Sequence, residues 1–290
     1  MSNVFDGVTD NNIKEKLLKT LDLPKGEGDY YLDYYGKKIS FNGIKLLKPE
    51  YTKLPLTDIH KKEIKRCKED FYYFVYNYCK ILTKDGITFP EIRNYQKELL
   101  NVLLLENDTI ILLSRQAGKS VIVGLYLLWQ GIFKTDINIG IAGNTHSLAK
   151  EILNKIKLVF LHLPIWLTPN IREWNKNSIE FDNNVRILTA PTTGDAFRGF
   201  TINILFVDEV AFIRPSLWQE FEDAVFPAQS ALSFKQNILT STANGFNHFY
   251  HYVKGAKENE ILDFKKDDLI ELENGKLVTI EEYYNKYFKK

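Results

Sequence analysis

The sequence predicts an α/β fold in which helices flank a largely parallel sheet. The first observation is that short apolar, β-branched runs alternate with helical stretches over residues 94–242, an order typical of βαβ units. The second is an expected strand, Thr109–Leu113, that runs through a polar loop into a helix. The third is an expected strand, Ile202–Val207, followed by two adjacent carboxylates. In such folds, ligands bind at the edge formed by the carboxyl ends of the strands.

The bulk composition limits the class of protein. The chain has 290 residues, of which 44% are apolar and 26% charged, so it can bury a sizeable core in one large or two smaller domains. The net charge of +1 excludes a globally basic nucleic-acid coat, but not a local basic groove. Cys67 and Cys79 lie in one predicted helix, which argues against a disulfide framework and favours a reducing compartment. No apolar run reaches the roughly 18 residues of a membrane span, and the N-terminus lacks a signal-peptide pattern.

A polar arm and two helices precede the alternating region. Residues 1–58 are polar and irregular, with a short amphipathic helix expected at Asn11–Leu21 and a turn at Lys25–Gly28. We interpret this stretch as an N-terminal arm or small subdomain. Apolar residues recur three and four apart over 59–82 and predict a helix there, and a second helix is expected at Asn94–Glu106.

The remaining elements follow from the switch between apolar runs and helical periodicity. We expect strands at Ile137–Ala142, Ser178–Phe181, Val185–Leu188 and Gln236–Thr242, and helices at Ser120–Trp129, Ser147–Phe160 and Phe221–Ala228. Asp182-Asn183-Asn184 is a turn signal that joins two of these strands into a hairpin. Residues 256–290 form an extension to which the sequence assigns no role, with a hairpin around Asn274-Gly275 and a helix at Glu281–Lys290.

One loop partly matches the phosphate-binding P-loop, Gly-x-x-x-x-Gly-Lys-Ser/Thr. The loop is Ser114-Arg115-Gln116-Ala117-Gly118-Lys119-Ser120, and Leu113 stands where the first glycine is expected. It follows a buried strand and opens a helix, so its backbone N–H groups and the helix dipole can face a phosphate. Lys119 can then reach the β- and γ-phosphates, and Ser120 can place its hydroxyl on Mg²⁺. The alternative is a polar loop that carries a lysine by chance, and the strand–loop–helix context favours the P-loop.

Two adjacent acids, Asp208 and Glu209, follow the buried run Ile204–Val207. Asp208 can hold Mg²⁺, directly or through water, and Glu209 can orient or deprotonate an attacking water. Two acids at a helix start are the alternative, because such acids are common there. A strand of this kind after a P-loop favours the catalytic interpretation. Polar side chains in Thr240–Gly245 can contact a γ-phosphate or the water, although Asn-Gly is also a generic turn signal.

Three further segments are ambiguous from their residues alone. Arg115 is either a cation near the γ-phosphate or an exposed loop arginine. Arg93 and Gln96 lie at the start of a helix before the loop, where a glutamine can hydrogen-bond the adenine edge, or where the residues form an ordinary polar cluster. Arg198 precedes the acidic strand, and a pair with Asp195 is its simplest interpretation.

Taken together, these residues resemble the ATPase half of the large terminase subunit of tailed bacteriophages, most closely its T-even-like branch. The family's P-loop lacks the first glycine, which accounts for Leu113, and carries an arginine at the place of Arg115. The resemblance covers about residues 60–255. Its matching stretches occur in family order at Arg93–Gln96, Ser114–Ser120, Glu173–Glu180, Asp195–Gly199, Val207–Ile213 and Thr240–Tyr250.

The resemblance implies a P-loop NTPase of the ASCE/RecA-like type, with its ATPase domain at 59–255. It implies a motor that hydrolyses ATP with Mg²⁺ and drives double-stranded DNA through a portal into a procapsid. The expected partners are the DNA, the portal protein, the small terminase subunit and further copies of the chain in a ring on the portal, with no membrane. The expected location is the cytoplasm of the infected bacterium, with transient docking on the procapsid.

The resemblance also implies a role for individual residues. Arg198 matches an arginine that acts in trans on a neighbouring subunit. The other implied roles are catalytic for Glu209, Arg115 and Lys119, Mg²⁺-binding for Ser120 and Asp208, adenine-binding for Arg93 and Gln96, and coupling of hydrolysis to movement for Ser241, Thr242, Ala243 and Asn244.

Two other functions compete with the packaging motor. A helicase of the Asp-Glu-x-His or Asp-Glu-x-Asp type would carry His or Asp at Ala211, and no arginine-rich final helicase motif is found. An inactive, truncated packaging scaffold is the non-enzymatic alternative, against which the presence of all the expected catalytic residues argues. The family usually continues into an RNase H-type nuclease domain, and because the sequence stops at Lys290 we expect no nuclease activity from it.

Overall fold

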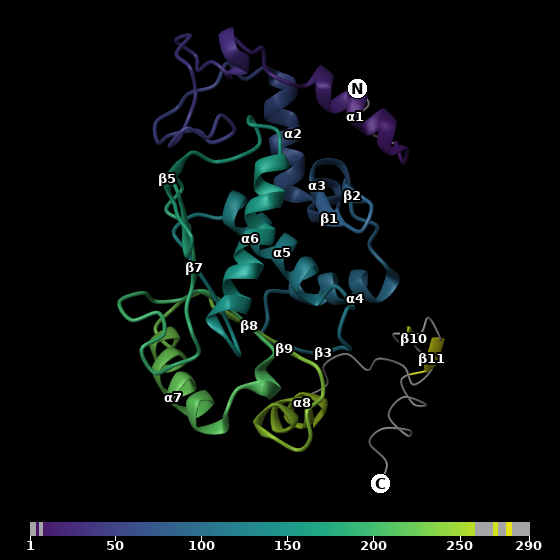
Figure 1. Cartoon of the computed structure of the whole chain (residues 1–290), viewed down its shortest axis with the longest axis vertical. Helices are drawn as coiled ribbons and strands as arrows, with labels where there is room; N and C mark the ends of the chain where they lie inside the picture. The colour runs from purple at the N-terminus through teal and green to yellow at the C-terminus, as the bar shows by residue number, and fades with distance from the viewer. Residues whose placement is uncertain (1–3, 6–7, 259–268, 272–276, 280–290) are drawn as a thin grey trace.

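A seven-stranded sheet in the order β3-β9-β8-β4-β7-β6-β5 forms the centre of the molecule (Figure 1). The computed structural model describes residues 4–5, 8–258, 269–271 and 277–279. The sheet is parallel from β3 to β7, and β6 and β5 extend it antiparallel. Its strands are β3 Thr109–Leu112, β4 Asn138–Gly143, β5 Ile171–Trp174, β6 Ser178–Phe181, β7 Arg186–Thr189, β8 Ile204–Asp208 and β9 Gln236–Ser241.

Helices cover both faces of this sheet, and β8 shows why its strands are apolar throughout. Ile204 and Phe206 belong to the hydrophobic cluster of one face, whereas Leu205 and Val207 belong to that of the other. Successive side chains of a strand point to opposite faces, so a strand covered on both sides has no polar face. The first cluster includes side chains of α4 Asn94–Leu103, α5 Lys119–Phe133 and α6 His146–His162, and the second those of α7 Pro215–Val225 and α8 His248–Glu258. The predicted α/β class with a largely parallel sheet is confirmed.

The single helix predicted over 59–82 is wrong. The chain forms α2 Asp58–Glu69 and α3 Phe71–Tyr78 instead. Asp70 between them is extended, with φ −129° and ψ 100°, and its carboxylate accepts the Tyr73 N–H at 2.8 Å. Asp70 thus acts as the N-cap of a new helix, a local feature that periodicity does not reveal.

Other predicted elements occur with shifted ends, and some elements were not predicted. Helix α7 begins at Pro215 rather than at Phe221, because proline suits the first turn of a helix. The hairpin of β6 and β7 is antiparallel as predicted, and Asn184 in its turn has φ 60°. The sequence did not predict β1 Ile81–Thr83, β2 Gly86–Thr88, β5 or α8.

The N-terminal arm packs onto the outer part of the sheet and onto α2 and α3 (Figure 1). Its helix α1 spans Asn11–Thr20, and Gly28 in the following turn has φ 72°. Pro49 forms a parallel bridge to Ile171 of β5. Leu21, Leu23, Tyr31, Ile39 and Leu47 are buried within the same cluster as α2 and α3. The arm therefore shares its core with the rest of the chain, and the division at residue 58 stays a prediction.

The two strands of the expected C-terminal hairpin pair antiparallel, as β10 Leu269–Glu271 and β11 Leu277–Thr279. The Asn274-Gly275 turn and the helix expected at Glu281–Lys290 lie outside the described residues.

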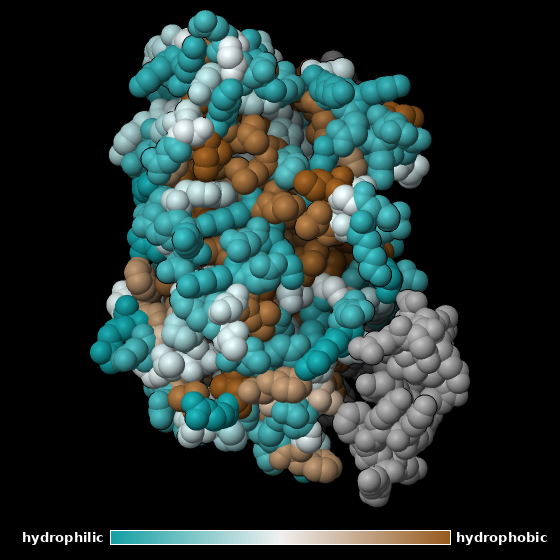
Figure 2. All heavy atoms as spheres, in the orientation of Figure 1, coloured by the Kyte–Doolittle hydropathy of each residue, from teal (hydrophilic) through white to brown (hydrophobic). Residues whose placement is uncertain are grey.

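Figure 2 shows a mostly hydrophilic face with hydrophobic side chains near its middle, in the region of α5, α6 and β1. Leu82, 64% exposed, lies beside an apolar groove of about 190 Å³ there. Among the described helices, none is long and apolar enough to cross a membrane.

Candidate active site

The carboxyl ends of three neighbouring parallel strands form the candidate site. β3 leads into the phosphate loop, which we define as Ser114–Ser120, and β8 leads into the acidic turn, defined as Asp208–Phe212. β9 lies between these strands and pairs with both. The sequence placed the loop and the acids at one sheet edge, and the topology brings them together across a single intervening strand.

Asp208, the last residue of β8, connects the phosphate loop to β9. Its carboxylate accepts the Ser120 hydroxyl at 2.6 Å through one oxygen, and the Thr240 hydroxyl at 2.6 Å through the other. Asp208 is only 2% exposed, so these hydrogen bonds also compensate for the burial of its charge. A hydroxyl and a carboxylate are the oxygen donors that Mg²⁺ takes from P-loop proteins, together with substrate phosphates. The donor set therefore fits Mg²⁺, although no cluster of three or more metal-ligating residues occurs in the described part of the chain.

Glu209 has two differently engaged carboxylate oxygens. Oε2 accepts the Ser241 hydroxyl at 3.3 Å and the N–H and hydroxyl of Thr242 at 3.3 and 3.4 Å. Oε1 lies 3.7 Å from the Lys119 Nζ. The backbone of Glu209 is left-handed, with φ 57° and ψ 42°. A non-glycine residue in this conformation costs free energy and occurs often at functional sites.

Lys119 lies at the base of the phosphate loop. Its side chain is 6% exposed, and its Nζ donates to the Leu113 carbonyl at 3.1 Å. Burial lowers the pKa of Lys119, the charges of Glu209 and Asp208 oppose this, and Arg115 adds a further lowering. The side chain thus sits between an acid that stabilises its charge and a low-dielectric environment that disfavours it.

The backbone of the phosphate loop needs glycine at position 118. Gly118 has φ 77° and precedes the first turn of α5, and Gln116 also has a positive φ of 62°. A Cβ at position 118 would lie 2.8 Å from Gln96 Nε2. That amide donates to the Ala117 carbonyl at 3.0 Å, as does the Tyr95 hydroxyl. The start of α4 therefore fixes the loop from one side.

A known protein family matches the part of the chain that contains the candidate site. The family described as "Terminase large subunit, T4likevirus-type, N-terminal" matches residues 110–286, more than half of the chain. The chain belongs to this terminase family. The matched region includes most of the phosphate loop's strand, the whole loop, the acidic turn and β9.

A solved terminase structure shares the fold. The large terminase of bacteriophage HK97 matches with a TM-score of 0.55 at 18% identity, over 66% of this chain and 41% of that protein. The large terminase ATPase domain of Thermus phage P74-26 matches with a TM-score of 0.43 at 19% identity, over 56% and 74%. The likeness to the HK97 protein shows the fold alone, and the chain spans less than half of that protein's length. The P-loop NTPase fold that the resemblance implied is confirmed.

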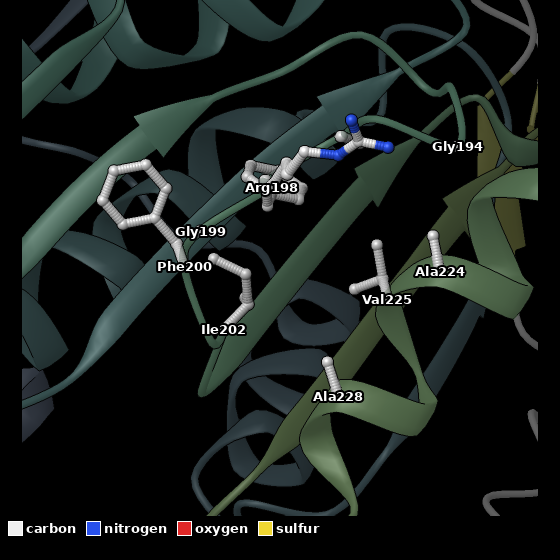
Figure 3. Close-up of a pocket in the computed structure, with 10 residues that line it drawn as sticks. Gly194, Arg198, Gly199, Phe200, Ile202, Ala224, Val225 and Ala228 are labelled. Carbon is white, nitrogen blue, oxygen red and sulfur yellow. The ribbon is translucent and has the colours of Figure 1, made fainter.

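The two arginines expected from the terminase family lie in different places. Arg115 is exposed, and its guanidinium carbon lies 5.5 Å from the centre of the Phe212 ring, so it reaches from the loop to the acidic turn. The Arg198 side chain is 80% exposed and pairs with Asp195 at 2.5 Å. It lines a pocket of about 250 Å³ opposite Val225, with its guanidinium extended toward Gly194 (Figure 3). The structure thus brings Arg115, and not Arg198, to the candidate site of this chain.

The segment expected to bind adenine lies against the phosphate loop. Gln96 donates to Ala117, and its Oε1 accepts the Arg93 N–H at 2.9 Å. Both ends of its amide are therefore engaged within the chain, and its adenine contact stays a prediction.

Sequence reasoning missed several residues of the site. It did not single out Thr240 as the partner of Asp208, or Tyr95 as a partner of the loop. It also did not assign roles to Asn247 and His248, whose side chains donate to the backbone of the acidic turn. The only sequence signal for Thr240 is its position at the end of a buried strand, where a polar side chain needs a partner.

Proposed function

We propose that this chain is the ATP-hydrolysing engine of a viral DNA-packaging motor. One observation carries the proposal: Asp208 links the loop and the strand β9 through Ser120 and Thr240, while Glu209 beside it faces Lys119. This combination provides a phosphate-binding lysine, a metal-binding pair and a carboxylate for water within one sheet edge. Membership in the terminase family supports the same conclusion.

Glu209 is proposed to act on the attacking water. Three donors hold Oε2, so Oε1 is the oxygen free to accept a proton once Lys119 moves onto a phosphate. The water oxygen then bonds to the γ-phosphorus, its proton passes to Glu209 Oε1, and the bond from that phosphorus to the β–γ bridging oxygen breaks. ADP and phosphate are the products. Lys119 thereby links phosphate binding to release of the catalytic carboxylate.

The other site residues take supporting roles in the proposal. Ser114 to Ser120 surround the phosphates, Ser120 and Asp208 hold Mg²⁺, and Arg93 and Gln96 lie near the adenine. A bound Mg²⁺ supplies positive charge that offsets the phosphate oxygens. Arg115 acts in cis on the γ-phosphate, because its loop position places it beside Lys119. Arg198, exposed and paired with Asp195, acts on a neighbouring copy.

Coupling to DNA is proposed through β9 and the turn after it. Ser241 ends this strand, and Thr242, Ala243 and Asn244 follow it. Ser241 and Thr242 hold Glu209 directly. The Glu209 carboxylate would therefore transmit a change at the γ-phosphate to Ser241 and Thr242. The proposed partners are double-stranded DNA, the portal protein, the small terminase subunit and further copies in a ring, in the cytoplasm of the infected host.

Phosphate release from ATP tests the proposal. We expect Mg²⁺-dependent release by the wild-type chain, a rate that rises with double-stranded DNA, and loss of release in Glu209→Gln. The glutamine keeps the size of the side chain and cannot take the proton, so this variant should still bind a fluorescent ATP analogue.

Other outcomes would point to the competing functions. Equal background release by wild type and Glu209→Gln would leave the chain a non-enzymatic scaffold. Unwinding of a forked duplex without a capsid would favour a helicase. Release that double-stranded DNA leaves unchanged would support an ATPase but contradict the motor.

A further inference from the structure

The acidic turn is held by side chains from a segment 30 to 40 residues later in the chain. The Ala211 N–H donates to the Ser241 hydroxyl at 3.1 Å, and the Ala211 carbonyl accepts the amides of Asn244 and Asn247 at 2.9 and 2.8 Å. The Val210 carbonyl lies 2.9 Å from His248 Nε2. Four side chains thus fix the two residues that follow Glu209.

His248 occupies a defined position between the acidic turn and α7. Its ring is stacked on that of Trp218, with centroids 5.5 Å apart and planes 16° from parallel. A carbonyl can only accept, so Nε2 must donate to Val210. Nδ1 is buried and has no hydrogen-bond partner among the described residues, which fits the neutral imidazole. One bond of His248 therefore anchors the turn, and the ring stack anchors His248.

The two polar atoms of the Asn247 side chain make different hydrogen bonds, and a substitution can remove one kind and keep the other. Its Oδ1 accepts the N–H groups of Phe249 and Tyr250 at 3.1 and 3.3 Å and so caps the start of α8. Its Nδ2 donates to the Ala211 carbonyl and also, at 2.9 Å, to the Asn244 carbonyl of the preceding turn. Aspartate at this position keeps the cap and loses the donor.

These contacts matter because Glu209 has a backbone conformation that its neighbours must maintain. A left-handed non-glycine residue reverts to a lower-energy conformation unless the surrounding structure fixes it. Reversion at Glu209 would rotate its side chain away from Ser241, Thr242 and Lys119. We propose that Asn247 and His248 are positioning residues for Glu209, which hold the Val210 and Ala211 carbonyls and so aim the catalytic carboxylate. This inference rests on the proposed hydrolytic role of Glu209.

The experiment measures kcat and KM for ATP in Asn247→Asp and His248→Phe. Phenylalanine keeps a flat ring against Trp218 and removes the donor. We expect kcat to fall by about tenfold to a hundredfold, as for a misaligned catalytic group, with KM and the affinity for a fluorescent ATP analogue within about twofold of wild type. The KM is preserved because neither side chain contacts the phosphate loop. His248→Gln, which restores an amide donor, should recover part of kcat.

His251→Phe is the matched control, since it makes the same chemical change one turn later on α8. His251 is exposed and contacts Tyr250 rather than the acidic turn, so its kcat should equal that of wild type. Thermal unfolding of each variant shows whether a low kcat comes from misalignment or from loss of fold. We expect His248→Phe and His248→Gln to unfold at similar midpoint temperatures, so a higher kcat in His248→Gln would not come from greater stability. A wild-type kcat in both Asn247→Asp and His248→Phe overturns the inference. An equally low kcat in His248→Phe and His248→Gln overturns it too. If wild type and Glu209→Gln do not differ in phosphate release, the proposed function fails instead.

Discussion

The phosphate loop and the acidic turn face each other across one strand, but they are held very differently. The loop exposes Arg115 and Gln116, and α4 anchors it through a single carbonyl, that of Ala117. In the acidic turn, by contrast, Val210 and Ala211 are buried and fixed by four side chains. This difference fits the proposed roles, in which the loop receives a phosphate and the turn keeps a carboxylate in place. Catalytic groups gain most when their orientation is fixed before the reaction.

A few side-chain contacts connect the phosphate loop to the acidic turn. Ser120 bonds to Asp208, Lys119 pairs with Glu209, and Arg115 lies over Phe212. Changes in the loop should therefore alter nucleotide binding first, whereas changes that loosen the acidic turn should alter the rate with binding preserved. Each of the following predictions tests one side of this difference.

The largest expected effect is that of Lys119→Ala. Lys119 is the buried cation of the loop, so its loss removes the proposed phosphate ligand and leaves Glu209 without its ion-pair partner. We expect hydrolysis to fall by at least about a hundredfold and the affinity for a fluorescent ATP analogue to fall with it. Lys97→Ala, which removes an exposed lysine of α4, serves as the control. Hydrolysis at the wild-type rate in Lys119→Ala would show that the loop does not bind the reacting phosphate.

An intermediate effect is expected for Gly118→Ala, measured as the free energy of unfolding in urea. Its φ of 77° is unfavourable for alanine, and the added Cβ would meet the Gln96 amide at 2.8 Å. Gly43→Ala is matched, because Gly43 has φ 82° and open space around it. The conformational cost is about 1 kcal/mol for both. For Gly118, the Gln96 amide must also shift and lose its hydrogen bond to Ala117, which adds about 1 kcal/mol. Equal destabilisation of the two variants would mean that α4 does not restrain the loop.

Particular residues show what the sequence was able to predict. Strands β3, β4, β8 and β9 can be recognised in the sequence as apolar runs. Gly118, Lys119 and the two acids lie at or after strand ends, which a parallel sheet brings to one edge. The break at Asp70 was missed because a capping side chain outweighs a continuous apolar stripe. The contacts of Asn247 and His248 were missed for a different reason. Their partners are backbone carbonyls more than 30 residues away, and such contacts leave no pattern in the sequence.

The smallest expected effect concerns the pH dependence of the acidic turn's anchor. Burial lowers the pKa of His248, while its bond to the Val210 carbonyl and the charge of Glu222 oppose this. As the pH falls below the unfolded-state pKa of about 6.5, the unfolded chain binds a proton that folded His248 does not yet bind, so stability decreases. His146, whose pKa burial and Lys150 also lower, contributes with the same sign. Urea unfolding at pH 7.5 and 5.5 should therefore show a smaller loss of stability in His248→Gln than in wild type, because the contribution of His248 is removed and that of His146 is kept. The same loss in both proteins would mean that His248 titrates alike in the folded and unfolded chain, and that its ring is not held as a neutral donor to the turn.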